Sequence, residues 1–289
     1  MASICERTRT SILYSSAIVV TVFSGYSWHL YTIHIHRSFM MQLSGQNETC
    51  PALLTLPIGY LQEDGLERTG VVMAHGEEAD DYVREPVSSL AMHLARQGYL
   101  VMRYYCRQKE QRRQRIFERT VDAADASPYA RNIKKWVYIG YGNGARIAAS
   151  VGYKSLKPKD GFVFVSYPWM EPMPPPPKQK SGTPTPVDSL GPLFRLAEAS
   201  KPPQLYISGS LDSNCEFSQL RTLGGVVSSS GIDARICVIS GVDEKLCAKQ
   251  KQKVAVPVVK EMNTLVQRFL ESVTKEEAFS EGLELKNAK

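Results

Sequence analysis

The sequence has very few histidines, and all of them lie in its first third. Five of the 289 residues are histidine, namely His29, His34, His36, His75 and His93. Residues 94–289 therefore contain no imidazole, which is the side chain most often used as a general base. Hydrolytic mechanisms that place a histidine base late in the chain are excluded.

Paired cysteines and nucleotide-binding motifs are also absent. The six cysteines are scattered and form no C-x-x-C: Cys5, Cys50, Cys106, Cys215, Cys237 and Cys247. This usage indicates a reducing compartment or buried thiols rather than a disulfide framework. No His/Cys cluster has metal-ligand spacing, and no Walker A or dinucleotide fingerprint occurs, so we expect no metal and no cofactor.

Charge is missing from one long segment near the N-terminus. Residues 11–33 contain no Lys, Arg, Asp or Glu, and this length would span a bilayer, although Ser, Thr, Gly and His interrupt it. Three interpretations stay open: a membrane anchor or uncleaved signal, an organellar targeting segment, and a poorly ordered or wrongly assigned extension. We expect membrane association if the segment inserts, and otherwise a cytoplasmic or nuclear protein. The sequon Asn47-Glu48-Thr49 matters only if the downstream part is lumenal.

The remaining composition is that of a globular protein with a sizeable core. Hydrophobic residues make up 43% and charged residues 22%. We expect an N-terminal extension over residues 1–44, one domain over residues 50–275 and a charged tail over residues 276–289.

The net charge of +6 is mild and does not by itself indicate nucleic-acid binding. Residues 103–119 carry seven basic and two acidic side chains, a local net of +5. The candidate basic patch comprises Arg107, Lys109, Arg112, Arg113 and Arg115. Such a run could bind acidic protein, lipid headgroups or nucleic acid, and the plain alternative is a solvated loop and helix face.

Short apolar runs alternate with helical stretches from residue 70 onward. The predicted strands are Gly70–His75, Tyr99–Tyr104, Lys135–Gly140, Gly161–Tyr167, Gln204–Ser208 and Ala234–Ile239. Continuous apolar runs suit strands buried on both faces of a parallel sheet. Helices are predicted from Pro86 to Gly98, over about 113–126, directly after Gly144 and from Pro257. The alternation predicts a doubly wound, mainly parallel α/β sheet.

A proline-rich excursion interrupts this pattern. Residues 168–203 hold 11 of the 17 prolines, which fix φ and remove backbone donors. A short helix is predicted within it over Leu193–Ala199. The excursion is interpreted as a surface loop, a lid over a pocket, or a ligand for a proline-binding partner.

The turn after the Lys135–Gly140 strand carries the most informative motif. Gly140-Tyr141-Gly142-Asn143-Gly144 leads from the strand straight into a helix rich in small residues, as a G-x-nucleophile-x-G elbow does. A plain glycine-containing strand–turn–helix is the alternative. The spacing is not that of G-x-G-x-x-G.

The stretch from Gly70 to Val273 resembles the α/β-hydrolase-like family of testis-expressed protein thirty and the third subunit of the non-specific-lethal chromatin complex. The resemblance rests on the order and spacing of segments 70–76, 98–104, 140–151, 165–168, 193–196 and 205–212. It implies an α/β-hydrolase fold with a Ser–acid–His triad.

The triad positions implied by this resemblance can be checked one by one. Gly142 stands where the serine would be, and glycine has no nucleophile. Asp212 stands at the acid position, where a loop-capping turn is the plain alternative. Glu244 lies nearest the histidine position. Two of three triad members are missing, so only residual catalysis would remain.

A binding pocket could survive without the nucleophile. His75, Gly76 and the N–H of Asn143 could still hold an anion or a carbonyl group. Other residues could in principle act as the nucleophile, but none stands in an elbow motif with a base nearby in the sequence: Ser166, Ser208, Ser210, Cys215 and Cys247. We therefore expect a catalytically inactive member that binds a protein partner or small ligand. The alternatives are a serine-type hydrolase with a relocated nucleophile and an adaptor tethered to a membrane through residues 11–33.

Overall fold

The computed structural model describes ten segments of the chain. These are residues 35–42, 49–57, 68–76, 81–107, 110–154, 159–169, 191–199, 201–215, 217–247 and 256–276. The uncharged segment 11–33, the prolines at 172–186, Lys109 and the tail after residue 276 lie outside them. Within the described segments, no helix is both long enough and apolar enough to cross a membrane.

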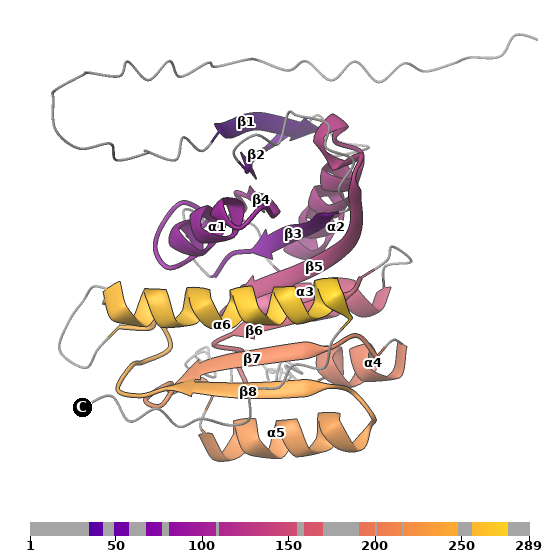
Figure 1. Ribbon diagram of the computed structural model, residues 1–289. Helices are drawn as coiled ribbons and strands as arrows, with labels where there is room; N and C mark the ends of the chain where they lie inside the picture. Colours follow the sequence, from indigo (N-terminus) through magenta and orange to yellow (C-terminus); the bar gives the residue numbers. More distant parts are fainter. Residues whose placement is uncertain are drawn as a thin grey trace, which may run out of the picture.

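One sheet of eight strands organises the fold (Figure 1). The strands are β1 (Ile35–Gln42), β2 (Thr49–Leu56), β3 (Arg68–Ala74), β4 (Leu100–Tyr104), β5 (Ile133–Tyr141), β6 (Gly161–Val165), β7 (Gln204–Gly209) and β8 (Ala234–Ile239). Their order is β1-β2-β4-β3-β5-β6-β7-β8. β3 to β8 run parallel, whereas β2 is antiparallel to both β1 and β4. The carboxyl ends of six strands therefore meet at one edge of the sheet.

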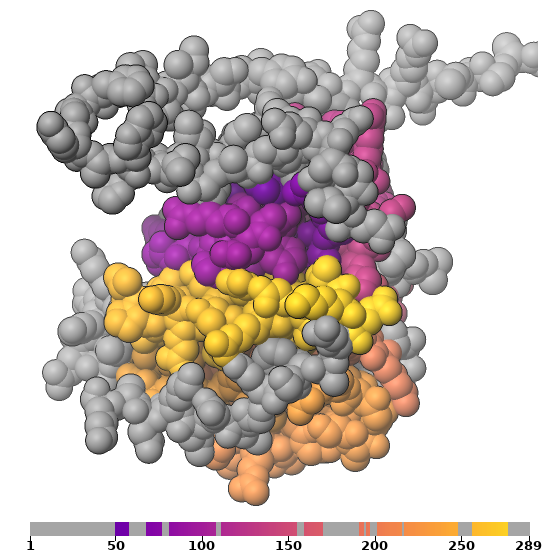
Figure 2. All heavy atoms as spheres, viewed as in Figure 1, coloured from indigo at the N-terminus to yellow at the C-terminus, as the bar shows by residue number. Residues whose placement is uncertain are grey.

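Helices cover both faces of this sheet. They are α1 (Val87–Arg96), α2 (Glu110–Asp125), α3 (Asn143–Lys154), α4 (Gly191–Ala199), α5 (Phe217–Ser229) and α6 (Val256–Lys275). Buried side chains of α1 and α6 pack on one face, and those of the other four helices on the opposite face. Figure 2 shows α6 lying beside α1, where the His93 ring meets Gln267 Oε1 at 2.7 Å.

The six predicted strands are confirmed, with shifts of at most two residues at their ends. The helices predicted after Pro86, Gly144 and Pro257 and within the proline-rich excursion are confirmed too. Pro86, the first residue of the predicted helix, stands at the N-cap of α1, one position before the helix begins.

Two strands and one α-helix were not predicted, namely β1, β2 and α5. The sheet begins inside the segment expected to be an extension, because β1 pairs along its whole length with β2. Pro51 interrupts the pattern of β2, and paired glycines weaken the helical pattern of α5. β1 is an edge strand, β2 lies next to it, and α5 is a peripheral helix, and sequence signals are weakest in such places.

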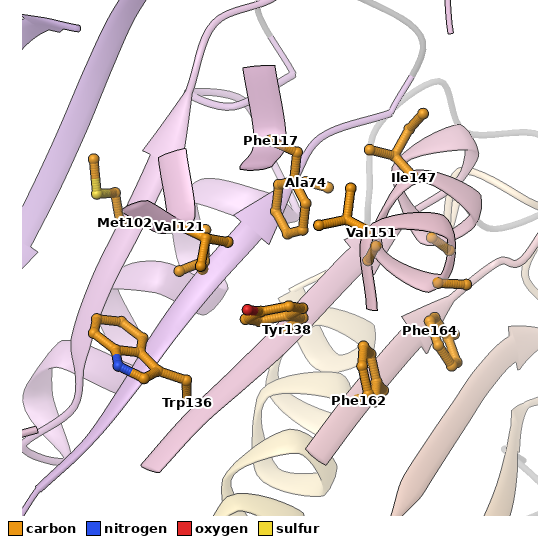
Figure 3. Packing of buried hydrophobic residues seen from close by; sticks show 14 of the residues in the cluster. Ala74, Met102, Phe117, Val121, Trp136, Tyr138, Ile147, Val151, Phe162 and Phe164 are labelled. Atoms are coloured by element: carbon orange, nitrogen blue, oxygen red, sulfur yellow. The ribbon is translucent and has the colours of Figure 1, made fainter. Parts of the chain in front are cut away.

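The larger core contains a row of aromatic rings that crosses the sheet. Figure 3 shows Tyr138 of β5 between Phe117 of α2 and Phe162 of β6. The ring centroids are 5.5 and 5.6 Å apart, in edge-to-face contacts. Each ring is fully buried, and burying such a side chain is worth about 1.5–3 kcal/mol.

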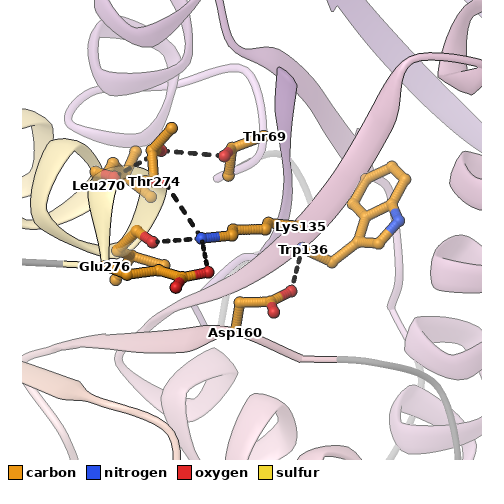
Figure 4. Close-up of polar contacts among 8 residues, drawn as sticks. Thr69, Lys135, Trp136, Asp160, Leu270, Thr274 and Glu276 are labelled. Atoms are coloured by element: carbon orange, nitrogen blue, oxygen red, sulfur yellow. Dashed lines mark hydrogen bonds and ion pairs between the residues drawn. The ribbon is translucent and has the colours of Figure 1, made fainter. Parts of the chain in front are cut away.

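Lys135 holds the C-terminal end of α6 against the sheet, at the edge where the parallel strands begin. Its ammonium donates to the carbonyls of Val273 and Thr274 at 3.0 and 3.1 Å, and to Glu276 at 2.9 Å (Figure 4). A cation beside the last helical carbonyls satisfies groups that have no intrahelical donor. These contacts lie at the amino ends of the parallel strands. They therefore position α6 from the side of the sheet that is far from the carboxyl ends of the strands.

Candidate functional site

The turn between β5 and α3 has the backbone of a nucleophile elbow. Gly142 follows β5, has φ +53°, and precedes the first residue of α3. Its N–H donates to Val165 O at 2.9 Å, and its carbonyl accepts from Ala145 N at 2.9 Å. A left-handed residue between strand and helix turns the chain sharply, so the central residue faces outward from the carboxyl edge.

The three glycines of this turn are constrained differently. A Cβ on Gly140 would lie 2.2 Å from Ala145 Cα, and one on Gly144 would lie 2.3 Å from Ala74 O. A Cβ on Gly142 would meet only Gly76 Cα, at 3.8 Å. The outer glycines are therefore required by close backbone approach, whereas the central position has room for a side chain and lacks one.

The loop after β3 forms the neighbouring wall. His75 is fully buried, and its ring lies 5.2 Å from that of Tyr104. Arg113 donates to the carbonyls of His75 and Gly76 at 2.6 and 2.5 Å. His75 therefore shapes the loop from inside the core, and Gly76 is the member of the pair that faces Gly142.

Arg113 does not contribute to a surface patch. Its side chain is buried, because α2 turns it toward the loop after β3. Arg107 and Arg115 are exposed, Arg112 is half-buried, and Lys109 lies outside the described residues. The expected five-residue patch is therefore smaller than the sequence suggested, and its buried member holds the site wall instead.

Asp212 lies in the loop after β7, at the position expected for the acid. Its Oδ1 accepts from the N–H groups of Asn214 and Cys215 at 2.9 and 3.1 Å. Its Oδ2 accepts from Ser208 Oγ at 2.9 Å. Burial raises the pKa of Asp212, and these hydrogen bonds oppose that rise. The loop-capping alternative is confirmed, and it occupies both carboxylate oxygens.

The loop after β8 is held by Asp243 rather than by a catalytic residue. Asp243 Oδ1 accepts from Lys245 N at 3.0 Å and from Cys247 N at 2.8 Å. Glu244, in the middle of this turn, accepts from Ser213 Oγ at 3.5 Å. Glu244 thus lies next to the Asp212 loop.

Tyr141 connects these loops, and it was not singled out from the sequence. Its hydroxyl donates to the Glu244 carbonyl at 3.3 Å, and its ring lies against Gly76. Burial raises its pKa far above the usual value, and the nearby Asp81, Cys247, Asp243 and Asp212 add to the rise. The elbow motif contained Tyr141, but only the fold reveals the acidic groups around it.

The proposed replacement nucleophiles are poorly placed for catalysis. Burial raises the pKa of Cys215 to about 12 and also raises that of Cys247, so both remain thiols at neutral pH. Ser208 donates to a carboxylate, and Ser210 accepts from Gly241 N at 2.8 Å. Ser166 is buried at φ +50°, and its hydroxyl has no hydrogen-bond partner among the described residues. No histidine lies within 70 residues of any of them in the sequence.

Metal ligands do not gather at this edge. Among the residues that the structure describes, no group of three or more His, Cys, Asp or Glu side chains could hold a metal ion.

Comparison with known proteins identifies the fold. No protein-family profile matches the chain, and no curated protein matches it significantly. An α/β serine hydrolase homologue from Coxiella burnetii superposes with a TM-score of 0.56 at 16% identity, covering 81% of this chain and 97% of its own. A dienelactone hydrolase from Anabaena variabilis gives a TM-score of 0.54 at 12% identity, with coverage of 81% and 97%. Est1E from Butyrivibrio proteoclasticus gives 0.57 at 9% identity, with coverage of 82% and 99%.

These likenesses and the strand order define the class of protein. The chain has the α/β-hydrolase fold, with a mainly parallel sheet and a sharp turn after its central strand β5. Its turn after β5 has Gly142 at the centre, which supplies no nucleophile, and no histidine follows His93 in the sequence.

Proposed function

We propose that this protein uses an α/β-hydrolase fold for binding and does not catalyse hydrolysis. The observation that carries the proposal is Gly142. It occupies the centre of an elbow that has room for a side chain, and as a glycine it has no nucleophilic group there. The absence of histidine after residue 93 removes the base as well. Both losses act on the same reaction, so restoring either one alone would not restore turnover.

The ligand would bind at the carboxyl edge, over Gly142 and Gly76. Open α/β sheets bind ligands in the crevice outside the carboxyl ends of their strands. Asp81, Asp243 and Asp212 raise the pKa of Tyr141 there, and Glu244 raises that of Asp212. Carboxylates near the site repel an anion. The site therefore favours a neutral or cationic group, which could belong to a small molecule or to a protein partner.

A fluorophosphonate probe tests the inactivity of the site. We expect the purified protein to show no covalent labelling, whereas a serine hydrolase assayed in parallel is labelled. Labelling at one residue of this chain, mapped by peptide mass spectrometry, would overturn the proposal and reveal the relocated nucleophile.

Restoring the two missing groups tests whether the scaffold is intact. We expect Gly142→Ser combined with Glu244→His to hydrolyse p-nitrophenyl acetate faster than either single variant, since a triad acts as a unit. The single variants are the matched controls. Equal rates in all three proteins would mean that the divergence extends beyond the triad positions.

The alternative is an active hydrolase with its nucleophile elsewhere, and the hydrolases among the structural neighbours favour it. Replacing Ser166, Ser208, Ser210 and Cys215 one at a time with alanine would then abolish esterase turnover in one variant. Unchanged turnover in all four would remove these residues from consideration.

Kinship with the family of testis-expressed protein thirty and the third subunit of the non-specific-lethal complex is part of the same proposal. It is supported by the motif segments 70–76, 98–104 and 205–212, which overlap the strands β3, β4 and β7. A family relationship would add a protein partner to the expected ligands.

A further inference from the structure

Two cysteines face each other across β2 and the end of β4. The antiparallel register pairs Leu53 with Arg103 and Ala52 with Tyr104. The pairing continues for one more step, because Tyr105 N donates to Pro51 O at 2.8 Å. In an antiparallel register each step moves one residue in opposite directions along the two strands. Cys50 therefore lies directly opposite Cys106.

This position is of the type that suits a disulfide. Pro51 and Tyr105 share the backbone hydrogen bond, so the next pair is non-hydrogen-bonded, with Cα atoms about 4.5 Å apart. Disulfides span Cα distances of about 4.4–6.8 Å. Cys50 is 4% and Cys106 3% exposed, and both belong to the same core cluster on one face of the sheet. Cys50 Sγ lies 2.6 Å from Tyr105 O, the carbonyl of the peptide bond that leads into Cys106.

We propose that Cys50 and Cys106 are a dithiol pair which forms a reversible cross-strand disulfide by exchange with a small disulfide such as oxidised glutathione. One protein thiolate attacks a glutathione sulfur, forms a mixed disulfide and releases the first glutathione thiol. The other protein thiolate then attacks the protein sulfur of that mixed disulfide and releases the second glutathione thiol. The protein loses two hydrogen atoms, and these reduce one oxidised glutathione to two reduced molecules.

The surroundings of the pair make this exchange slow. Burial raises the pKa of Cys50 to about 12, with Cys106 nearby adding to the rise, so little thiolate exists at neutral pH. β2 must also open from β4 before glutathione can reach either sulfur. We expect the rate to increase with pH, since the thiolate is the attacking species.

The bond would join β2, and through β2 the edge strand β1, to the end of β4. β2 carries β1, and Cys106 precedes the helix whose Arg113 holds the loop of His75 and Gly76. Residues 50–106 would lie within the closed loop, so their freedom in the unfolded chain would fall. For a loop of this size we expect oxidation to raise the Tm by about 5–10 °C.

Peptide mapping of the full-length protein is the direct test. The reduced protein is incubated in glutathione redox buffers at pH 8.5 until the oxidised fraction stops changing, and thiols are then blocked with N-ethylmaleimide. Cleavage after arginine should give residues 104–107 joined to residues 38–68, with a mass lower by two hydrogen atoms than the reduced pair. We expect Cys215, Cys237 and Cys247 to remain thiols. The proposal fails if Cys50 and Cys106 are alkylated even in the most oxidising buffer, or if either pairs with another cysteine.

Single substitutions provide a second measurement. Cys50→Ala and Cys106→Ala should lose the rise in Tm on oxidation, whereas Cys237→Ala should keep it. Cys237 is a matched control because it is a partly buried thiol on the far edge strand β8, opposite Ile207 rather than a cysteine. An equal rise in all four proteins would contradict the assignment. The map of the unaltered protein decides the question even where a variant fails to fold.

Discussion

The turn after β5 and the loop after β8 lie at the same edge of the sheet, but different forces hold them. Close backbone packing fixes the turn, because Gly140 and Gly144 touch Ala145 and Ala74. Hydrogen bonds hold the loop, because Asp243 Oδ1 accepts from two backbone N–H groups and the Asp243 backbone bonds to Leu246 and Cys247. The first region therefore keeps its shape whatever stands at its centre. The Glu244 side chain takes no part in the bonds of Asp243, so we expect its replacement to leave the loop in place.

Adding a methyl group to the turn should have the largest effect on stability. Gly144→Ala places a Cβ 2.3 Å from a backbone carbonyl that cannot move independently, so we expect a loss of about 3 kcal/mol or more. Gly142→Ala is the matched control, with room for the Cβ and only the strain of a positive φ, about 1–2 kcal/mol. Urea unfolding of both variants measures the difference. Equal losses would mean that the outer glycine is not required by close approach.

Removing the side chain that holds the β8 loop should have an intermediate effect. Asp243→Ala leaves the N–H groups of Lys245 and Cys247 without their acceptor, and we expect a loss of about 1–2 kcal/mol. Lys245→Ala, an exposed change in the same turn, should stay within about 0.5 kcal/mol of the unaltered protein. Denaturant midpoints decide the matter, and the interpretation of the loop is wrong if the two variants unfold together.

A smaller effect, visible mainly in its pH dependence, is expected at Asp212. Its pKa is raised in the folded state, so the folded protein binds more protons than the unfolded chain between the unfolded and the folded pKa. The contribution of Asp212 to stability is therefore most favourable at low pH and declines as pH rises through this window. Asp212→Asn keeps an acceptor for Asn214 and Cys215 and should remove that decline. Unfolding free energies measured from about pH 4 to pH 7 test this. A decline equally steep in Asp212→Asn would contradict the assignment.

The smallest effect should come from the contact between the two regions. Tyr141→Phe removes one hydrogen bond of 3.3 Å to the Glu244 carbonyl, which is worth about 0.5–1 kcal/mol. If the turn and the loop are held independently, Tyr141→Phe and Asp243→Ala should be additive in a double-mutant cycle. A coupling energy above about 0.5 kcal/mol would show that the two regions act as one unit.

The central part of the fold could be predicted from the sequence because it repeats a strong pattern. Buried parallel strands such as β3 and β6 are continuous apolar runs, and Gly142 stands in a recognisable strand–turn–helix. β1 was missed because a strand at the edge of a sheet is specified largely by its partner, and β2 was missed because Pro51 interrupts its pattern. In the sequence, Arg113 is one of several basic residues in a row. The structure shows that its position on α2 directs it toward the carbonyls of His75 and Gly76.

The sequence by itself determined what this protein lacks. No fold can supply a nucleophile at Gly142 or an imidazole beyond His93, because tertiary structure arranges side chains and does not create them. Only the tertiary structure decided which of the existing groups meet. Residues far apart in the chain, such as Tyr141 and Glu244 or Cys50 and Cys106, become neighbours through strand order and register. These long-range pairings leave no local pattern in the sequence, since each strand contributes only one half of the contact.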